Sequence, residues 1–332
     1  MNRAIYADER GRQTRPLRSS CLAATAVAYW LASSSLVGAE GTAARSLAEW
    51  RGIVEKNAPA APTAPLTSGR PRRVLVFSLF TGFHHTVVPY VDEVFRILGS
   101  KSGAFETTVS RDIESLDASS LARYDVLVLN NNCSIGPRRN LLLDELERNP
   151  RYQGLSPPAR EARASQLEQS MLRFVRGGGG LVVIHGAPTL LNNSPQFTDM
   201  VGGAFDYHPR SQQLTLRPVE PDHPLLAAFQ GKPFVHRDEP YCFWGAYAKK
   251  SFRPLLAIDP QGIDDGSAGK FGKDVRYAAW IKRYGAGRVF YCLPGHYEAS
   301  YESPIMLRFL LDGTQYAAGD LACDDRKLGD RE

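Results

Sequence analysis

The stretch GGGGLVVIHGAP, residues 177–188, decides the fold class of this 332-residue chain. Residues 181–184 form an uninterrupted apolar run, which is typical of a strand buried on both faces of a sheet. The preceding residues, 164–176, carry apolar side chains at helical spacing. The glycines therefore end a helix and lead into a strand. A phosphate-binding glycine loop has the reverse order, so nucleotide binding is not indicated.

The same alternation of apolar runs and helices continues on both sides of this stretch. Further strands are predicted at residues 72–79, 105–111, 124–132, 212–220, 252–258, 276–284 and 287–296. Helices are predicted at residues 86–100 and 303–318. This order predicts an α/β fold with a mostly parallel sheet and helices on both faces. The strands beginning near Arg72, Asp125 and Leu181 should be adjacent and parallel, and the C-terminal half should extend the sheet with strands of mixed direction.

The N-terminal part of the chain is typical of an export signal. A basic stretch ending at Arg18 precedes an apolar, small-residue stretch, and Val37-Gly38-Ala39 resembles a cleavage site. We therefore expect residues 1–39 to be a signal peptide, the mature protein to be periplasmic or extracellular, and no membrane contact to remain after cleavage. Much of the net charge of +5 comes from arginines in the first 20 residues, so nucleic-acid binding is not expected.

The mature chain is predicted to contain a single domain. Residues 40–71 are expected to form a spacer that ends in a proline- and alanine-rich linker at 57–71. The domain should cover residues 72–318, followed by a polar tail at 319–332. The sequence leaves open whether the protein forms a homo-oligomer.

Histidines follow three of the predicted strands. His84 and His85 follow the first strand, His185 follows the apolar run at 181–184, and His296 follows the last strand. The carboxyl ends of parallel strands form the ligand crevice of an open α/β sheet, so these side chains should share one rim. Imidazole titrates near neutral pH and is the commonest metal ligand. The pattern predicts a functional site there.

Carboxylates near aromatic residues provide partners for these histidines. Asp238 and Glu239 lie between His236 and Tyr241, and a carboxylate against aromatic walls is suited to acid/base chemistry. His223 precedes Pro-Leu-Leu and is expected to pack or to cap a short helix.

A metal ion is an open alternative that the spacing does not specify. The motif H-E-x-x-H is absent, and two consecutive histidines cannot both face one ion from an extended strand. No cofactor is predicted outright. A divalent ion, if one is bound, would be held by His185, His208 and Glu239.

Six motifs in order give the chain a family resemblance. These are GFHH (82–85), GGGLVVIHGA (178–187), GGAFDYHP (202–209), DHPLL (222–226), RDEPY (237–241) and GRVFYCLPGH (287–296). Their order and spacing resemble the trehalose-utilisation (ThuA-like) family over roughly residues 72–318. The resemblance implies a flavodoxin-like fold related to class I glutamine amidotransferases, in which a nucleophilic cysteine occupies a strained elbow after a central strand.

The elbow of this chain carries no cysteine. Either Ile184 or His185 matches the nucleophile position, and Cys133 follows a different strand. Glutamine amidotransferase activity is therefore not expected. Because His185 follows its strand, it should lie outside the packed core, and His185→Ala should change stability by no more than roughly 1 kcal/mol.

The resemblance implies a role in carbohydrate metabolism, in particular acid/base chemistry on an oxidised, 3-keto sugar by hydrolysis, elimination or isomerisation. The residues expected to carry the chemistry are His185, His208, Glu239 and His296. Substrate contacts are expected from His84, His85, Asp238, Tyr207 and Tyr241. Tyr207, Tyr241, Phe243 and Trp244 would either stack on pyranose faces or form a core aromatic cluster.

Two other functions fit the same sequence. The protein would then be a non-catalytic carbohydrate-binding module or a partner subunit of an exported sugar-processing complex. An enzyme requires titratable groups that contact one another in the crevice. A binding module requires aromatic and amide groups without an acid–base pair.

Overall fold

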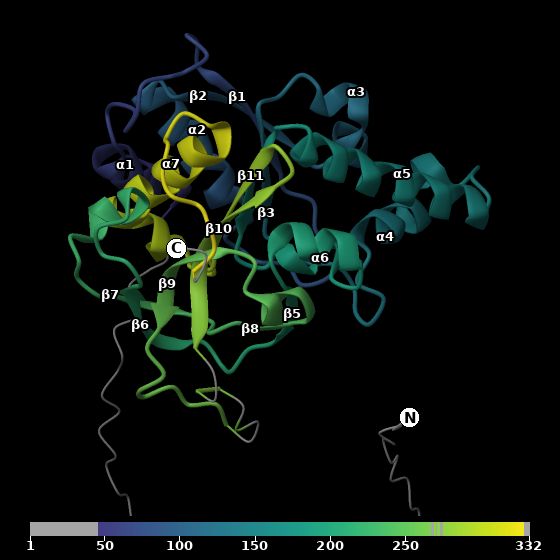
Figure 1. The fold of residues 1–332 in the computed structure, drawn as a ribbon. Helices are drawn as coiled ribbons and strands as arrows, with labels where there is room; N and C mark the ends of the chain where they lie inside the picture. The colour runs from purple at the N-terminus through teal and green to yellow at the C-terminus, as the bar shows by residue number, and fades with distance from the viewer. Residues whose placement is uncertain (1–45, 267–268, 270, 273–274, 329–332) are drawn as a thin grey trace, which may run out of the picture. The chain divides into compact units, whose positions relative to one another are not determined.

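A nine-stranded sheet forms the centre of the protein in the computed structural model, which describes residues 46–266, 269, 271–272 and 275–328 (Figure 1). The strand order is β2-β1-β3-β4-β11-β10-β9-β6-β7. The first five are parallel: β2 (Phe105–Ser110), β1 (Arg72–Phe77), β3 (Val126–Asn130), β4 (Gly180–Ile184) and β11 (Gly287–Cys292). The other four pair antiparallel: β10 (Arg276–Tyr284), β9 (Arg253–Ile258), β6 (Gln212–Pro218) and β7 (Phe234–Asp238).

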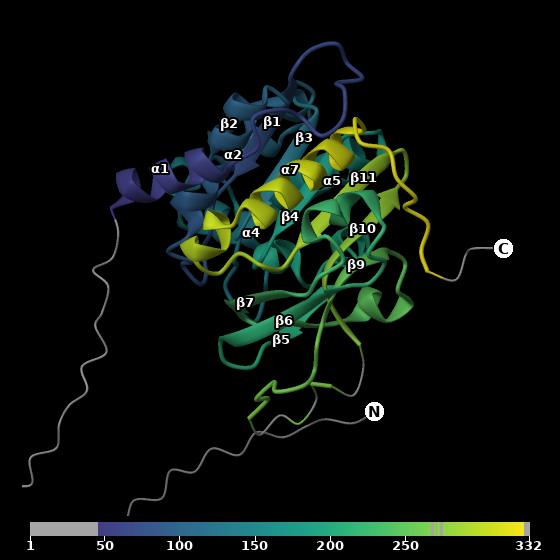
Figure 2. The same cartoon turned by 90° about the vertical axis from the view of Figure 1, so that its left-hand side faces the viewer.

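The predicted topology is confirmed. Strands β1, β3 and β4 are adjacent and parallel, and every residue of β3 and β4 is buried. This burial explains their uninterrupted apolar sequence. In Figure 2 the sheet runs from β2 and β1 at one end to β6 and β7 at the other. Strands β5 (Ala204–Tyr207) and β8 (Cys242–Trp244) pair antiparallel and form a second, two-stranded sheet.

Helices cover both faces of the sheet, as predicted. Helices α2 (Val88–Ser102) and α7 (Pro304–Ala318) pack together on one face, where α7 contacts β11, β4 and β3. Helices α5 (Pro157–Arg176) and α6 (Pro195–Val201) contact β11 from the other face. Helix α4 (Leu141–Arg148) packs on α5, as does the short α3 (Ala118–Leu121). No helix among the described residues is long and apolar enough to cross a membrane.

The folded unit starts earlier than the expected boundary at Arg72. Within the described residues, the compact unit already includes Ser46. Helix α1 (Leu47–Asn57) buries Trp50 and Val54 against it and contacts α2, α7 and the 3₁₀ helix η6 (Glu298–Glu302). Residues 46–71 of the expected spacer are therefore part of the fold, because Trp50 and Val54, four positions apart, form one buried helical face. The predicted signal peptide, residues 1–39, lies outside the described residues.

The expected linker and tail are held to each other and to the body of the protein. Thr63 donates a hydrogen bond to Asp312, and Thr67 donates through its backbone N–H and its hydroxyl to Asp320. The guanidinium of Arg72 forms a two-pronged ion pair with the same Asp320 carboxylate. Charge-assisted hydrogen bonds of this kind are stronger than neutral ones, so they hold the segment before β1 in place.

Candidate functional site

His185 occupies a strained turn directly after β4. Its φ of +48° lies in the left-handed region, which residues other than glycine seldom adopt. Its backbone N–H donates to Cys292 O, the last residue of β11, at 2.9 Å. His185, and not Ile184, therefore stands at the elbow position. Strain of this kind persists where the surrounding structure fixes the residue, and it is concentrated at functional sites.

The side chain of His185 is fully buried, contrary to the expectation that it lies outside the core. Residues from the loops after β7 and β11 cover the ring. The place of His185 at the end of its own strand did not indicate this covering. Its Nδ1–H donates to Leu293 O at 2.8 Å, because a carbonyl can only accept. Nε2 is thereby left to face Tyr241 Oη at 3.0 Å and Glu239 Oε2 at 3.2 Å.

Two glycines allow the chain to approach this imidazole closely. A Cβ on Gly186 would lie 2.8 Å from Cys133 Sγ and 3.0 Å from His85 Cε1. A Cβ on Gly295 would lie 2.7 Å from Tyr301 Oη and 3.1 Å from His185 Cβ. A side chain at either position would displace a neighbour, since real Cβ contacts are longer. The glycines of the HGA and PGH motifs are thus explained by packing around the site.

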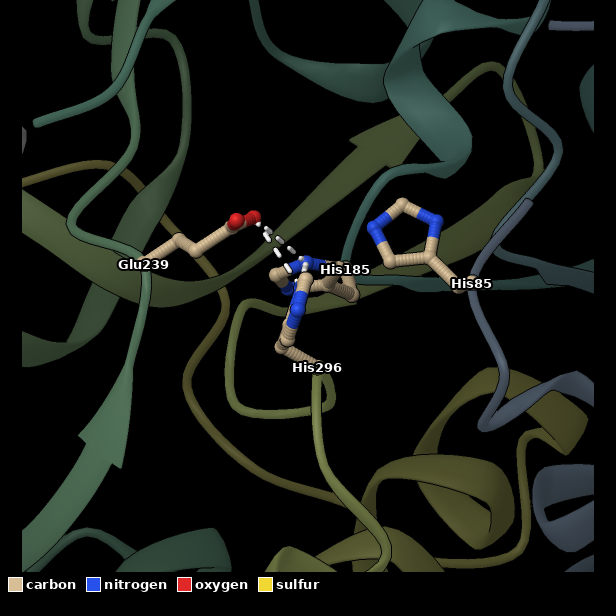
Figure 3. A group of neighbouring side chains, drawn as sticks. All are labelled: His85, His185, Glu239 and His296. Atoms are coloured by element: carbon tan, nitrogen blue, oxygen red, sulfur yellow. Dashed lines mark hydrogen bonds and ion pairs between the residues drawn. The ribbon is translucent and has the colours of Figure 1, made fainter. Parts of the chain in front are cut away.

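The expected rim of histidines forms, and Figure 3 shows its centre. His296 Nδ1 lies 3.1 Å from Glu239 Oε2 and 3.3 Å from His185 Nε2. His85 completes a group of four residues whose ligand atoms all lie within 4.8 Å of one another. His84 does not join it: its ring is exposed and stacks on Phe80.

Asp238 takes a different role from the substrate contact expected of it. Its side chain is fully buried, and its Oδ2 accepts hydrogen bonds from the backbone N–H of Gly295 at 2.8 Å and of His296 at 3.3 Å. Oδ2 also contacts His236 Nε2 at 3.0 Å, and Oδ1 accepts from the backbone N–H of Glu239 at 2.8 Å. Asp238 therefore fixes the loop that presents His296 and leaves no surface for a substrate.

The charges of the cluster follow from these contacts. Burial by itself would lower the pKa of His185, but the nearby Asp238 and the bond to Glu239 outweigh it and raise that pKa. Burial would raise the pKa of Glu239, yet hydrogen bonds from His185 and His296 hold it well below its usual range. Burial and the neighbouring histidines lower the pKa of His85 to about 2. An ionised Glu239 thus lies beside a neutral His85.

A cavity of about 210 Å³ opens on one side of the cluster. Its lining residues are Phe83, His85, Cys133, Arg139, Thr189, Phe205, His208, Glu239 and Tyr241. His208 lies beside Glu239, with 3.7 Å between Nε2 and Oε2, while its Nδ1–H donates to Pro209 O at 2.8 Å. The metal-ligand set expected from sequence thus changes: the close group contains His85 and His296, and His208 stands outside it.

The candidate aromatic residues separate into two groups. Tyr241 lines the cavity, as expected. Tyr207 donates its hydroxyl to Asp265 at 3.0 Å, Phe243 is buried among Tyr247, Trp280 and Tyr291, and Trp244 borders another hollow; these three are not among the cavity's lining residues.

Sequence reasoning missed five residues of the cavity wall, Phe83, Cys133, Arg139, Thr189 and Phe205. Phe83 is 62% exposed, and its ring packs edge-on against His85. Phe205 packs edge-on against Tyr241, and Arg139 places a cation in the lining. Phe83 lies in the GFHH motif and Phe205 in the GGAFDYHP motif. In both motifs only the histidines and the tyrosine were interpreted as site residues. Arg139 lies in the charged segment after β3, which shows no periodic signal. His223, as expected, caps a 3₁₀ helix, η4 (Pro224–Phe229).

Comparisons with known proteins agree with the fold and its motifs. The family model ThuA, described as trehalose utilisation, matches residues 73–317. A ThuA-like protein from Bacteroides uniformis has a similar structure, with a TM-score of 0.56 and 17% identity over 75% of this chain and 92% of that one. Another, from Parabacteroides merdae, gives a TM-score of 0.53 and 18% identity over 76% and 92%. Among curated proteins, none matches the sequence significantly. The family match covers most of the chain, which therefore belongs to the ThuA, or trehalose-utilisation, family.

Proposed function

We propose that this protein catalyses proton transfer on a sugar that carries a ketone, such as a 3-keto disaccharide. The observation that carries the proposal is the mutual contact of His185 Nε2, His296 Nδ1 and Glu239 Oε2, at 3.1, 3.2 and 3.3 Å. A binding module needs no such acid–base group, whereas an enzyme that moves protons does. Membership of a trehalose-utilisation family supports a carbohydrate as the substrate.

A ketone at C3 of a sugar makes the hydrogen on C2 acidic. A base that removes this proton leaves the electron pair in an enolate, with the negative charge on the ketone oxygen. The C1–O bond can then break, and the departing oxygen takes a proton from an acid; alternatively, the proton returns to C2 from the other side. Elimination and isomerisation therefore begin with the same step.

The groups around the cavity are suited to this step. Glu239 is ionised and lines the cavity, so we assign it as the base. The Tyr241 hydroxyl, whose pKa burial raises well above 10, stays protonated and supplies a proton to the departing oxygen. The cation of Arg139 in the lining favours the negative charge that develops on the ketone oxygen. The rings of Phe205 and Tyr241 offer apolar faces for a pyranose.

Hydrogen–deuterium exchange tests the proposed first step directly. The protein is incubated with 3-keto-trehalose in D₂O, and the C2 proton is followed by NMR. We expect loss of the C2 signal, with or without cleavage, at a rate well above that without protein. Unoxidised trehalose is the matched substrate control, because its C2–H is not acidic and should not exchange.

Two variants connect the exchange to the cluster. Glu239→Gln removes the base and should reduce exchange by roughly 100-fold or more, as for loss of a general base. Glu147→Gln makes the same chemical change at an exposed residue paired with Arg138 and should leave the rate unchanged. Binding of the keto sugar without exchange in the unaltered protein would contradict the enzyme and favour a carbohydrate-binding module.

A further inference from the structure

We propose that His85, His185, His296 and Glu239 together bind one divalent transition-metal ion. The inference deepens the proposed function and rests on it for the substrate, while the ion site itself rests on the geometry below. The four residues come from the loops after β1, β4, β7 and β11 and converge on one point (Figure 3).

The spacing of three ligand atoms fits one small ion. Metal–nitrogen and metal–oxygen bonds of roughly 2.0–2.2 Å, at angles between those of octahedral and tetrahedral sites, place neighbouring ligand atoms roughly 3.0–3.5 Å apart. His185 Nε2, His296 Nδ1 and Glu239 Oε2 are separated by 3.1, 3.2 and 3.3 Å. The fourth ligand atom, from His85, lies within 4.8 Å of the others.

Two of the imidazoles are held in the tautomer that ligation requires. His185 donates its Nδ1–H to Leu293 O at 2.8 Å, so the lone pair of Nε2 points to the centre of the group. Cys133 donates its S–H to Gly186 O at 3.7 Å, and its sulfur lies 3.6 Å from His85 Nδ1 as an acceptor. Nε2 of His85 therefore carries a lone pair as well. Such outer partners, which fix the ring and the tautomer, are a regular feature of histidine metal sites.

The ligand set indicates the class of metal. Three imidazole nitrogens and one carboxylate suit Zn²⁺, Mn²⁺, Fe²⁺, Co²⁺ or Ni²⁺, whereas Mg²⁺ and Ca²⁺ prefer oxygen ligands throughout. The neighbouring carboxylate of Asp238, 3.5 Å from His185 Nδ1, adds a second negative charge behind the histidines. A divalent cation would balance the charges of Asp238 and Glu239.

The site also has room for a substrate. His85 and Glu239 both line the 210 Å³ cavity, so a bound ion would have one side open, as catalytic metal sites do. When bound, such an ion polarises a ketone oxygen as a Lewis acid. The contacts of Glu239 with His185, His208 and His296 all use Oε2. Its Oε1 thus stays available as the base, and Tyr241 still supplies the proton.

Metal binding is tested on the purified protein without reference to activity. The chain is freed of metal with a chelator, titrated calorimetrically with Zn²⁺, Mn²⁺ and Mg²⁺, and examined with Co²⁺ for the visible absorption of a nitrogen-ligated ion. We expect one site per chain for Zn²⁺ and Mn²⁺, visible Co²⁺ bands, and no comparable binding of Mg²⁺.

Neighbouring histidines provide a matched pair of variants. His85→Ala removes a proposed ligand and should weaken Zn²⁺ binding by at least about 100-fold, beyond the loss seen when only an outer partner is removed. His84→Ala, one residue away and outside the group, should bind as the unaltered chain does. Glu239→Gln should weaken binding as well, and thermal unfolding of each metal-free variant shows whether it is folded.

The results separate this inference from the proposed function. Absence of Zn²⁺ and Mn²⁺ binding in the folded protein overturns the metal site, even if C2 exchange is observed. Equal binding by His84→Ala and His85→Ala also overturns it. One-site binding that depends on His85 and Glu239, without exchange of any keto sugar, supports the metal site and contradicts the proposed reaction.

Discussion

Replacement of Asp238 by asparagine tests how the loop that carries His296 is held. The carboxylate accepts from three backbone N–H groups, those of Glu239, Gly295 and His296, and its remaining neighbours are the rings of His185 and His236. The side chain is fully buried, so water cannot replace a lost partner. The carboxylate is therefore the common acceptor for both segments that surround His185.

The magnitude follows from counting donors. Asparagine has nearly the same shape, but its NH₂ group must face donors in either orientation. The less costly orientation turns NH₂ toward the N–H of Glu239 and loses one hydrogen bond to a charged acceptor, about 1.5–3 kcal/mol. A buried donor left without a partner costs about 1–3 kcal/mol more. We therefore expect Asp238→Asn to lower the free energy of unfolding by about 2.5–6 kcal/mol.

Thermal unfolding followed by circular dichroism measures this loss. For a domain of this size, about 2.5–6 kcal/mol corresponds to a decrease in Tm of roughly 4–10 °C. Asp264→Asn, at an exposed residue that pairs with Arg210, is the matched control and should leave Tm unchanged. A Tm of Asp238→Asn equal to that of the unaltered protein would refute the assignment of Asp238 as the common acceptor.

Three further outcomes are expected. Gly186→Ala places a Cβ 3.0 Å from His85 Cε1 and should destabilise the protein by about 1–3 kcal/mol. Gly52→Ala, where a Cβ meets nothing within 4 Å, should not destabilise it. Denaturant unfolding of the two variants measures the difference. Burial would raise the pKa of Asp320, but the bond to Arg72 outweighs it and lowers that pKa. The stability from Asp320 is therefore present above its unfolded pKa and lost as pH falls through its folded pKa, so acid unfolding of Asp320→Asn should show a weaker pH dependence than that of the unaltered chain. Finally, N-terminal sequencing of the native protein should find cleavage after Ala39, and a retained Met1 would contradict export.

The fold was predictable because the apolar sequences of the central strands indicate that these strands are buried. Strands β3 and β4, and β1 from Val74 onward, are buried on both faces, and their sequences there are therefore almost entirely apolar. Docking of α1 was not predicted, since the apolar residues of one short helix do not show what they pack against. Trp50 and Val54 are the signal that was available.

The site was predictable only as far as strand ends could be placed. His185 and His296 follow neighbouring parallel strands, and this adjacency brings them together. The roles of Asp238 and Glu239 were not separable in advance, because consecutive residues of an extended segment point to opposite sides and the sequence does not say which side is open. Likewise, residue type did not separate Tyr241, which lines the cavity, from Tyr207, which is not among the lining residues.

The contact of α1 with η6 has a consequence for where this protein can be shortened. Trp50 Nε1 donates a hydrogen bond to Glu298 O at 3.2 Å, and Asn57 Nδ2 donates one to Glu302 O at 2.7 Å. Both acceptors lie in the segment that directly follows His296. An expression clone started at Arg72, where the apolar pattern begins, would lack this brace. Its loop could then sample other positions, and the loss would resemble a catalytic defect although no reacting group had been altered.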